Sequence, residues 1–174
     1  MEDLLFRGII GTINQEGNSK LLKGLEEKKM EKIGFSLLCF FIAYVVVTWI
    51  GFLHTVFNIK VLHMKSMKES GGKGKGLGEA YNKTKPWHPL YNLIIFPIFS
   101  YIYLKGLDTI TLSNVVATSL MWGTSAIVID LVGWVLIKHP LSLTFRRFYI
   151  EYQPWITLVY LVMYASPFIA YYLI

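Results

Sequence analysis

The chain contains four long stretches of apolar residues, and short polar segments separate them. The stretches cover about 33–61, 88–104, 113–137 and 154–174. Roughly 20 consecutive apolar residues in a helix cross the hydrocarbon core of a bilayer, whereas a water-soluble core has no use for several such runs. The pattern therefore predicts an all-α, polytopic integral membrane protein with about four transmembrane helices, which form one domain over residues 33–174.

The ends and lengths of these stretches carry further detail. Residues 33–61 are longer than a hydrocarbon core at roughly 1.5 Å of rise per residue, so this helix must tilt or project from the membrane. Residues 88–104 are short, and Pro97 should kink the helix that they form. Ser113 is expected to cap the start of the third helix.

Residues 1–32 form a polar segment ahead of the first stretch. A polar break at 14–19 divides this segment, and after it Leu21, Leu22 and Leu25 alternate with lysines. Alternating apolar and basic residues are typical of an amphipathic helix that lies in the membrane interface. We expect either such an interfacial helix or a solvated tail.

Two polar connections carry most of the remaining charge. Residues 64–86 form a loop rich in glycine and lysine, and residues 138–153 are amphipathic and aromatic, which predicts a loop in the membrane interface. Their lysines and arginines favour a cytoplasmic position for both loops. Lys28, Lys29 and Lys32 adjoin the first span and favour a cytoplasmic N-terminus instead. We favour cytoplasmic loops because the loops carry more lysines and arginines than the segment before the first span.

Composition agrees with a membrane protein and removes one class of function. Apolar residues make up 54% of the chain and charged residues 16%, against a charged share of about a quarter in soluble proteins. The net charge of +6 comes from lysines and arginines that flank apolar stretches. These residues suit anionic lipid headgroups at a bilayer surface. We therefore expect lipid and no nucleic acid among the partners, and a multi-pass location with the cell (plasma) membrane favoured.

Asp130 is the strongest candidate for a functional residue because it is a carboxylate deep inside an apolar stretch. Such a group costs several kcal/mol in a membrane unless it is paired, protonated or hydrated, so its side chain should face the protein interior. Small residues recur on the same predicted helical face: Ser119, Gly123, Ala126 and Gly133. A stripe of small residues lets a neighbouring membrane helix approach closely.

His54 is the expected partner of Asp130. His54 lies nine positions before His63, and Asp130 lies nine positions before His139, where the two predicted spans leave the membrane. Nine positions are about 13 Å of helix rise, so the two residues should lie at similar depths. Gly51 and Asn58 belong to a small and polar stripe on the same face as His54. The pair would form either a site that responds to protons or a small solute, or a buried polar contact that fixes the helix register.

Two other groups of side chains lie near predicted membrane surfaces. His63, His88 and His139 should emerge on one face, but none has the close spacing of a helix-borne metal motif, so we expect no metal and keep them as weak candidates. Arg146 and Arg147, with Tyr149 and Trp155, suit an anionic headgroup or ligand. The alternative is membrane anchoring with an ion pair between Arg147 and Glu151.

Three classes of function fit these features. The favoured one is a small transport or channel component, in which Asp130 and His54 respond to protons or to a small solute. The alternatives are a non-catalytic assembly subunit of a membrane complex, and an interfacial enzyme or lipid-binding protein that uses Arg146, Arg147 and the histidines. No catalytic constellation or cofactor motif is present, so we expect no cofactor. Four helices make a thin wall for a pathway, which favours a homo-oligomer or a membrane partner subunit.

Overall fold

The computed structural model describes residues 2–66, 69, 78–138 and 142–174, and every regular element in these ranges is a helix. The α-helices are α1 (Glu2–Lys60), α2 (Gly78–Thr84), α3 (His88–Lys105), α4 (Leu112–Ile129) and α5 (Trp155–Tyr172). A short 3-10 helix, η1 (Lys85–Trp87), joins α2 to α3. Two π-helices, η2 (Asp130–Leu136) and η3 (Arg146–Ile150), follow α4 and precede α5. The all-α class predicted from the sequence is confirmed.

The chain divides into two compact units, Met1–Ser36 and Leu37–Ile174. The first unit belongs to α1, which continues through residues 14–19, so the break predicted there is wrong. The following residues 20–32 are rich in leucine, lysine and glutamate, which are strong helix formers. These residues favour a continuous α1 despite the glycines in it. Leu22 and Met30 are exposed within this unit. The interfacial role of residues 1–32 stays a prediction.

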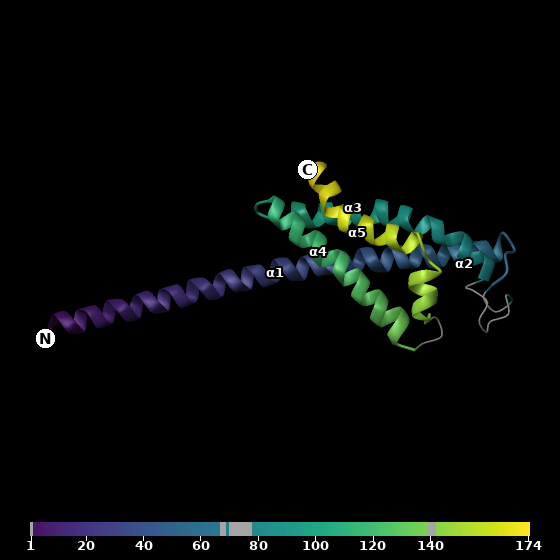
Figure 1. Ribbon diagram of the computed structural model, residues 1–174. Coiled ribbons are helices and arrows are strands. Elements are labelled where there is room, and N and C mark those ends of the chain that lie inside the picture. Colours follow the sequence, from purple (N-terminus) through teal and green to yellow (C-terminus); the bar gives the residue numbers. More distant parts are fainter. Residues whose placement is uncertain (1, 67–68, 70–77, 139–141) are drawn as a thin grey trace. The chain divides into compact units, whose positions relative to one another are not determined.

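The second unit is a bundle in which α3 and α4 both pack against α5 (Figure 1). Its core contains an aromatic trio from three helices: Phe40 of α1, Phe96 of α3 and Trp122 of α4, all fully or almost fully buried. The ring centroids of this trio lie 5.9 to 6.0 Å apart in tilted or edge-on geometry, which aromatic rings favour. Met163 and Val159 bring α5 into the same core.

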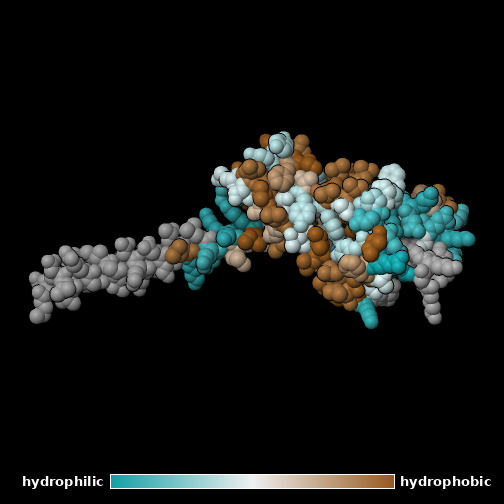
Figure 2. Space-filling model, in the orientation of Figure 1, coloured by the Kyte–Doolittle hydropathy of each residue, from teal (hydrophilic) through white to brown (hydrophobic). Residues whose placement is uncertain are grey.

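Within the described residues, three helices are long and apolar enough to cross a membrane: Leu22–Lys60, Leu112–Leu136 and Trp155–Tyr172. Their outward side chains include Trp49, Leu53, Leu120 and Leu161, each between 57% and 58% exposed. Figure 2 shows hydrophobic surface over much of this unit, with hydrophilic residues gathered around α2. Large apolar side chains facing outward suit lipid rather than water, and these helices indicate a membrane location.

The second predicted stretch forms α3, but α3 is not among these three helices. It has the same length as α5, 18 residues. Unlike α5, it contains His88, Asn92 and Lys105, and these residues lower its hydropathy. The structure therefore supports three spans by length and composition, one fewer than the sequence predicts.

The third predicted helix starts earlier than predicted, and its last part is a π-helix instead of an α-helix. Thr111, rather than Ser113, is the N-cap, because Thr111 Oγ1 accepts a hydrogen bond of 3.2 Å from the backbone N–H of Asn114. At Asp130 the α-helical pattern gives way to η2. A π-helix is wider than an α-helix, and π segments occur frequently at functional sites.

Candidate functional site

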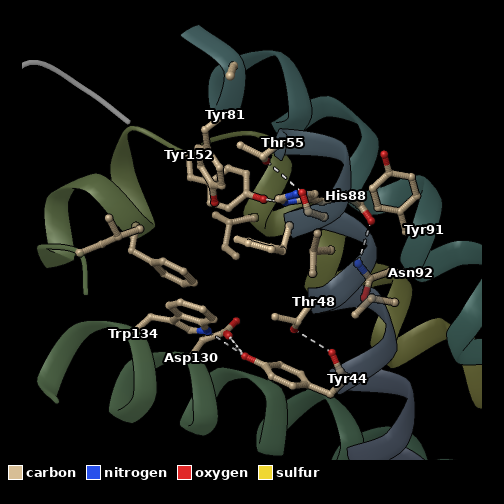
Figure 3. Close-up of a pocket in the computed structure, with 18 of the residues that line it drawn as sticks. Tyr44, Thr48, Thr55, Tyr81, His88, Tyr91, Asn92, Asp130, Trp134 and Tyr152 are labelled. Atoms are coloured by element: carbon tan, nitrogen blue, oxygen red, sulfur yellow. Dashed lines mark hydrogen bonds between the residues drawn. The ribbon is translucent and has the colours of Figure 1, made fainter. Parts of the chain in front are cut away.

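A pocket of about 310 Å³ lies among the helices of the second unit, as the close-up in Figure 3 shows. This volume is within the range of small-molecule sites. Most of its lining is apolar or aromatic: Tyr44, Val47, Thr48, Gly51, Phe52, Thr55, Ile59, Ser66, Ala80, Tyr81, His88, Tyr91, Asn92, Asp130, Trp134, Leu143, Phe148, Tyr152, Ile156, Val159 and Met163. Polar groups gather near its two ends.

Asp130 is at one end of the pocket and accepts hydrogen bonds through both carboxylate oxygens. Tyr44 Oη donates to Oδ1 at 2.5 Å, and Tyr160 Oη donates to Oδ2 at 2.8 Å. Trp134 Nε1 donates to Tyr44 Oη at 3.0 Å, so the tyrosine hydroxyl is fixed from both sides. Asp130 is only 6% exposed. Two hydroxyl donors stabilise its charge, as expected for a buried carboxylate.

The small residues before Asp130 position one of these donors. Ser119 Oγ donates to the backbone oxygen of Tyr164 at 2.5 Å, and the Tyr164 ring occupies the space that a side chain at Gly123 would need. Ala126 on the same face is fully buried. Tyr160 lies one helical turn before Tyr164 and so faces Asp130. At Gly133 nothing lies within 4 Å of an added Cβ, so the stripe ends before it.

His88 is at the other end of the pocket. Its Nδ1 is in hydrogen-bond contact with the hydroxyl of Tyr152, and a Cβ at Gly51 would lie only 2.9 Å from its Nε2. Figure 3 shows Tyr81 and Tyr152 beside it. The sequence marked Gly51 only as part of a small stripe, whereas its structural reason is this close approach of His88.

Lys85 supports the tyrosines at this end from outside the pocket. Its Nζ lies 5.7 Å from the centroid of the Tyr81 ring and 5.4 Å from that of Tyr152, and it donates to the backbone oxygen of Glu151 at 3.4 Å. Burial lowers the pKa of the Lys85 amine, and the Glu151 carboxylate acts in the opposite direction. The ammonium group is thus held by two aromatic faces.

The structure does not bring His54 to Asp130. His54 Nδ1 contacts the hydroxyl of Tyr91, and His54 follows Tyr44 by ten residues on α1, which is about 15 Å of helix rise. The common depth expected from the sequence does not hold, because the helical segment that contains His54, Leu22–Lys60, is 39 residues long. A helix much longer than the bilayer does not end at the membrane surface, so positions counted back from its end do not report depth.

Asn58 has a structural role. Its Nδ2 donates to the backbone oxygen of Ala80 at 3.1 Å and to Thr84 Oγ1 at 3.0 Å. Thr55 Oγ1 adds a further bond of 3.2 Å to Thr84 Oγ1. These bonds hold α2 against α1, next to the His88 end of the pocket.

Arg146 and Arg147 lie on η3, away from the pocket lining. Arg146 Nε is 3.4 Å from Glu151 Oε1, and the Arg146 side chain is 79% exposed. The ion pair predicted for Arg147 therefore belongs to Arg146, because a π-helix brings residues five apart, not four, onto one face. Tyr149 and Trp155 pack against the small core of Phe148, Tyr152 and Ile156.

Of the three histidines kept as weak metal candidates, the structure describes two. His63 is exposed and has a φ of 54°, while His88 faces the pocket. His139 lies outside the described residues. Within the described ranges, no group of three or more histidine, cysteine, aspartate or glutamate side chains is close enough to hold a metal ion.

The residues missed by the sequence reasoning are Tyr44, Tyr160 and Trp134. Tyrosine and tryptophan are common in apolar stretches, where most of them pack or lie near headgroups, so their positions alone carried no signal. The chain has no match among protein-family models, curated proteins or solved structures.

Proposed function

We propose that this protein is a small membrane transport component whose pocket holds a solute, with Asp130 as the polar contact. The pocket around a buried carboxylate is the observation that supports this function. Helices that serve only to hold a complex together gain stability from close packing, and an internal cavity reduces it. A carboxylate at this depth is costly and usually functional.

The structure offers less support for the other two classes. In an assembly subunit the small-residue stripe would serve only packing, and Ser119 and Gly123 do contact Tyr164 within the chain, but packing needs neither the pocket nor the buried Asp130. An interfacial enzyme would need Arg146 or Arg147 near other reactive groups, but neither lines the pocket. Arg146 is exposed and remains available to anionic headgroups.

The proposal includes α3 as a fourth span in the cell membrane. Ile94, Ile98 and Ile102 lie on one face of α3 and are between 46% and 54% exposed, which suits contact with lipid. Four spans make a thin wall around a pathway, so we include a homo-oligomer or a membrane partner in the functional form.

Accessibility of the pocket from the two membrane faces tests transport without knowledge of the solute. Cys39 is the only cysteine in the sequence, so Cys39→Ala gives a cysteine-free background. Thr48→Cys then places a thiol in the pocket lining, and Leu53→Cys places one on the same helix but outside the lining. The variants are reconstituted into vesicles and treated from one side, or from the other, with membrane-impermeant methanethiosulfonates of either charge.

A transport pathway predicts that Thr48→Cys reacts from both sides and that Leu53→Cys reacts from neither. Modification is read by mass spectrometry. Reaction of Thr48→Cys from one side only, or from none, would contradict transport and favour a closed assembly subunit or a binding protein.

A further inference from the structure

We infer that the solute is an organic cation, an amine or quaternary ammonium with an apolar body of small size, bound with its charge beside Asp130. This inference rests on the proposed pocket function and names its substrate class. It combines the charge, the aromatic lining and the size of the pocket.

The charge of Asp130 lacks a cationic partner in the described part of the chain. Its two oxygens accept hydrogen bonds from Tyr44 and Tyr160, and neither hydroxyl carries a positive charge. The ion pair between Arg146 and Glu151 lies on a different segment. A buried carboxylate without a counter-charge is costly, and a bound cation lowers that cost.

The lining next to Asp130 suits a cation with an apolar body. Tyr44 and Trp134 border the carboxylate, as Figure 3 shows. Phe52 is a further aromatic residue of the pocket lining. Aromatic faces attract cations, and the attraction is stronger in a site without water. Val47, Ile156 and Met163 of the same lining offer apolar surface for the rest of the molecule.

The same lining disfavours an anion. It contains one carboxylate and neither lysine nor arginine among the described residues. Lys85 lies near the far end, but its ammonium group faces the rings of Tyr81 and Tyr152 and donates to Glu151. An anionic solute would therefore meet the charge of Asp130 without a compensating cation.

Three ligands of similar shape and different charge test the inference on the purified full-length chain in detergent. They are benzyltrimethylammonium, its uncharged carbon analogue neopentylbenzene, and benzylsulfonate, which is anionic. Binding is measured by calorimetry. The cation is expected to bind at least about tenfold more tightly than the neutral analogue, and the anion is expected to show no binding.

Two carboxyl-to-amide variants locate the effect. Asp130→Asn should weaken binding of the cation by about tenfold or more, while Glu151→Gln, which removes a carboxylate outside the lining, should leave it unchanged. Equal binding of the three ligands by the wild-type chain would overturn the inference, and this comparison holds even if Asp130→Asn unfolds. Equal loss in both variants would overturn it too.

Failure of this inference is distinguishable from failure of the proposed function. If Thr48→Cys reacts from both sides but the cation does not bind preferentially, transport stands and the substrate class is wrong. If the cation binds but Thr48→Cys reacts from one side only, the substrate class stands and the pocket belongs to a binding protein rather than a transport component.

Discussion

At the scale of single residues, the account depends on how Asp130 is stabilised inside the helical bundle. Asp130 is 6% exposed, and its carboxylate accepts hydrogen bonds from two tyrosine hydroxyls. Hydrogen bonds to a charged group contribute more than neutral ones, and loss of one leaves a buried acceptor atom unsatisfied. The tyrosines should therefore matter for stability as well as for any bound solute.

Tyr160→Phe tests this dependence, because it removes one hydroxyl and keeps the ring. We expect the free energy of unfolding in detergent to fall by about 1–3 kcal/mol. Tyr172→Phe is the matched control on the same helix, since Tyr172 is 85% exposed. Equal stability of the two variants would show that the Tyr160 hydroxyl does not stabilise Asp130.

Part of this residue-scale picture follows from the sequence. Asp130 was identifiable because a charge inside an apolar stretch is rare and costly. Its partners were not identifiable, because Tyr44 and Tyr160 resemble many other tyrosines of the apolar stretches and lie 86 and 30 residues away along the chain. The structure does not bring His54, the expected partner, to Asp130. Its depth in the membrane had been inferred by counting along a helix that is longer than the bilayer.

At the scale of elements, close contact between α4 and α5 places Tyr160 opposite Asp130. The Tyr164 ring lies where a side chain at Gly123 would be, whereas no atom lies within 4 Å of an added Cβ at Gly133. These two glycines therefore form a matched pair for the same substitution.

Gly123→Ala should destabilise the protein by roughly 1–3 kcal/mol, because the Tyr164 ring and α5 must move away. Gly133→Ala should be neutral or stabilising by up to about 1 kcal/mol, since alanine favours helical backbone more than glycine does. Thermal unfolding of both variants is the measurement. The opposite order would contradict the described packing of α4 on α5.

The attachment of α2 gives a second prediction at this scale. Asn58→Ala removes the bonds to Ala80 and Thr84, so amide hydrogen exchange in residues 78–84 should become faster while α5 keeps its protection. Asn82→Ala changes an exposed asparagine of α2 and serves as the control. Unchanged exchange in α2 of Asn58→Ala would show that other contacts hold this helix.

The helices themselves were largely predictable, and their local departures were not. Apolar stretches gave α3, the α4–η2 segment and α5 close to their observed bounds, because hydropathy reports burial in lipid or protein. The π-helices were not predicted, because the composition of a segment does not show whether it forms an α-helix or a wider π-helix. Because residues five apart share a face of a π-helix, Glu151 pairs with Arg146 and not with Arg147 as predicted.

At the scale of the whole molecule, the number of spans determines on which sides the two termini lie. Four spans place both termini on one side, and three place them on opposite sides. With loops 64–86 and 138–153 in the cytoplasm, the proposal predicts that single cysteines or reporters at both ends are labelled from the non-cytoplasmic side. Labelling of the ends from opposite sides would remove α3 from the set of spans.

Transport by this protein can be measured as exchange of a cation across a membrane. The purified chain is reconstituted into vesicles that contain unlabelled benzyltrimethylammonium, and entry of the labelled compound is followed. The account predicts exchange above that of protein-free vesicles, strong reduction in Asp130→Asn, and normal exchange in Glu151→Gln. Binding of the cation without exchange above that of protein-free vesicles would contradict a transport function.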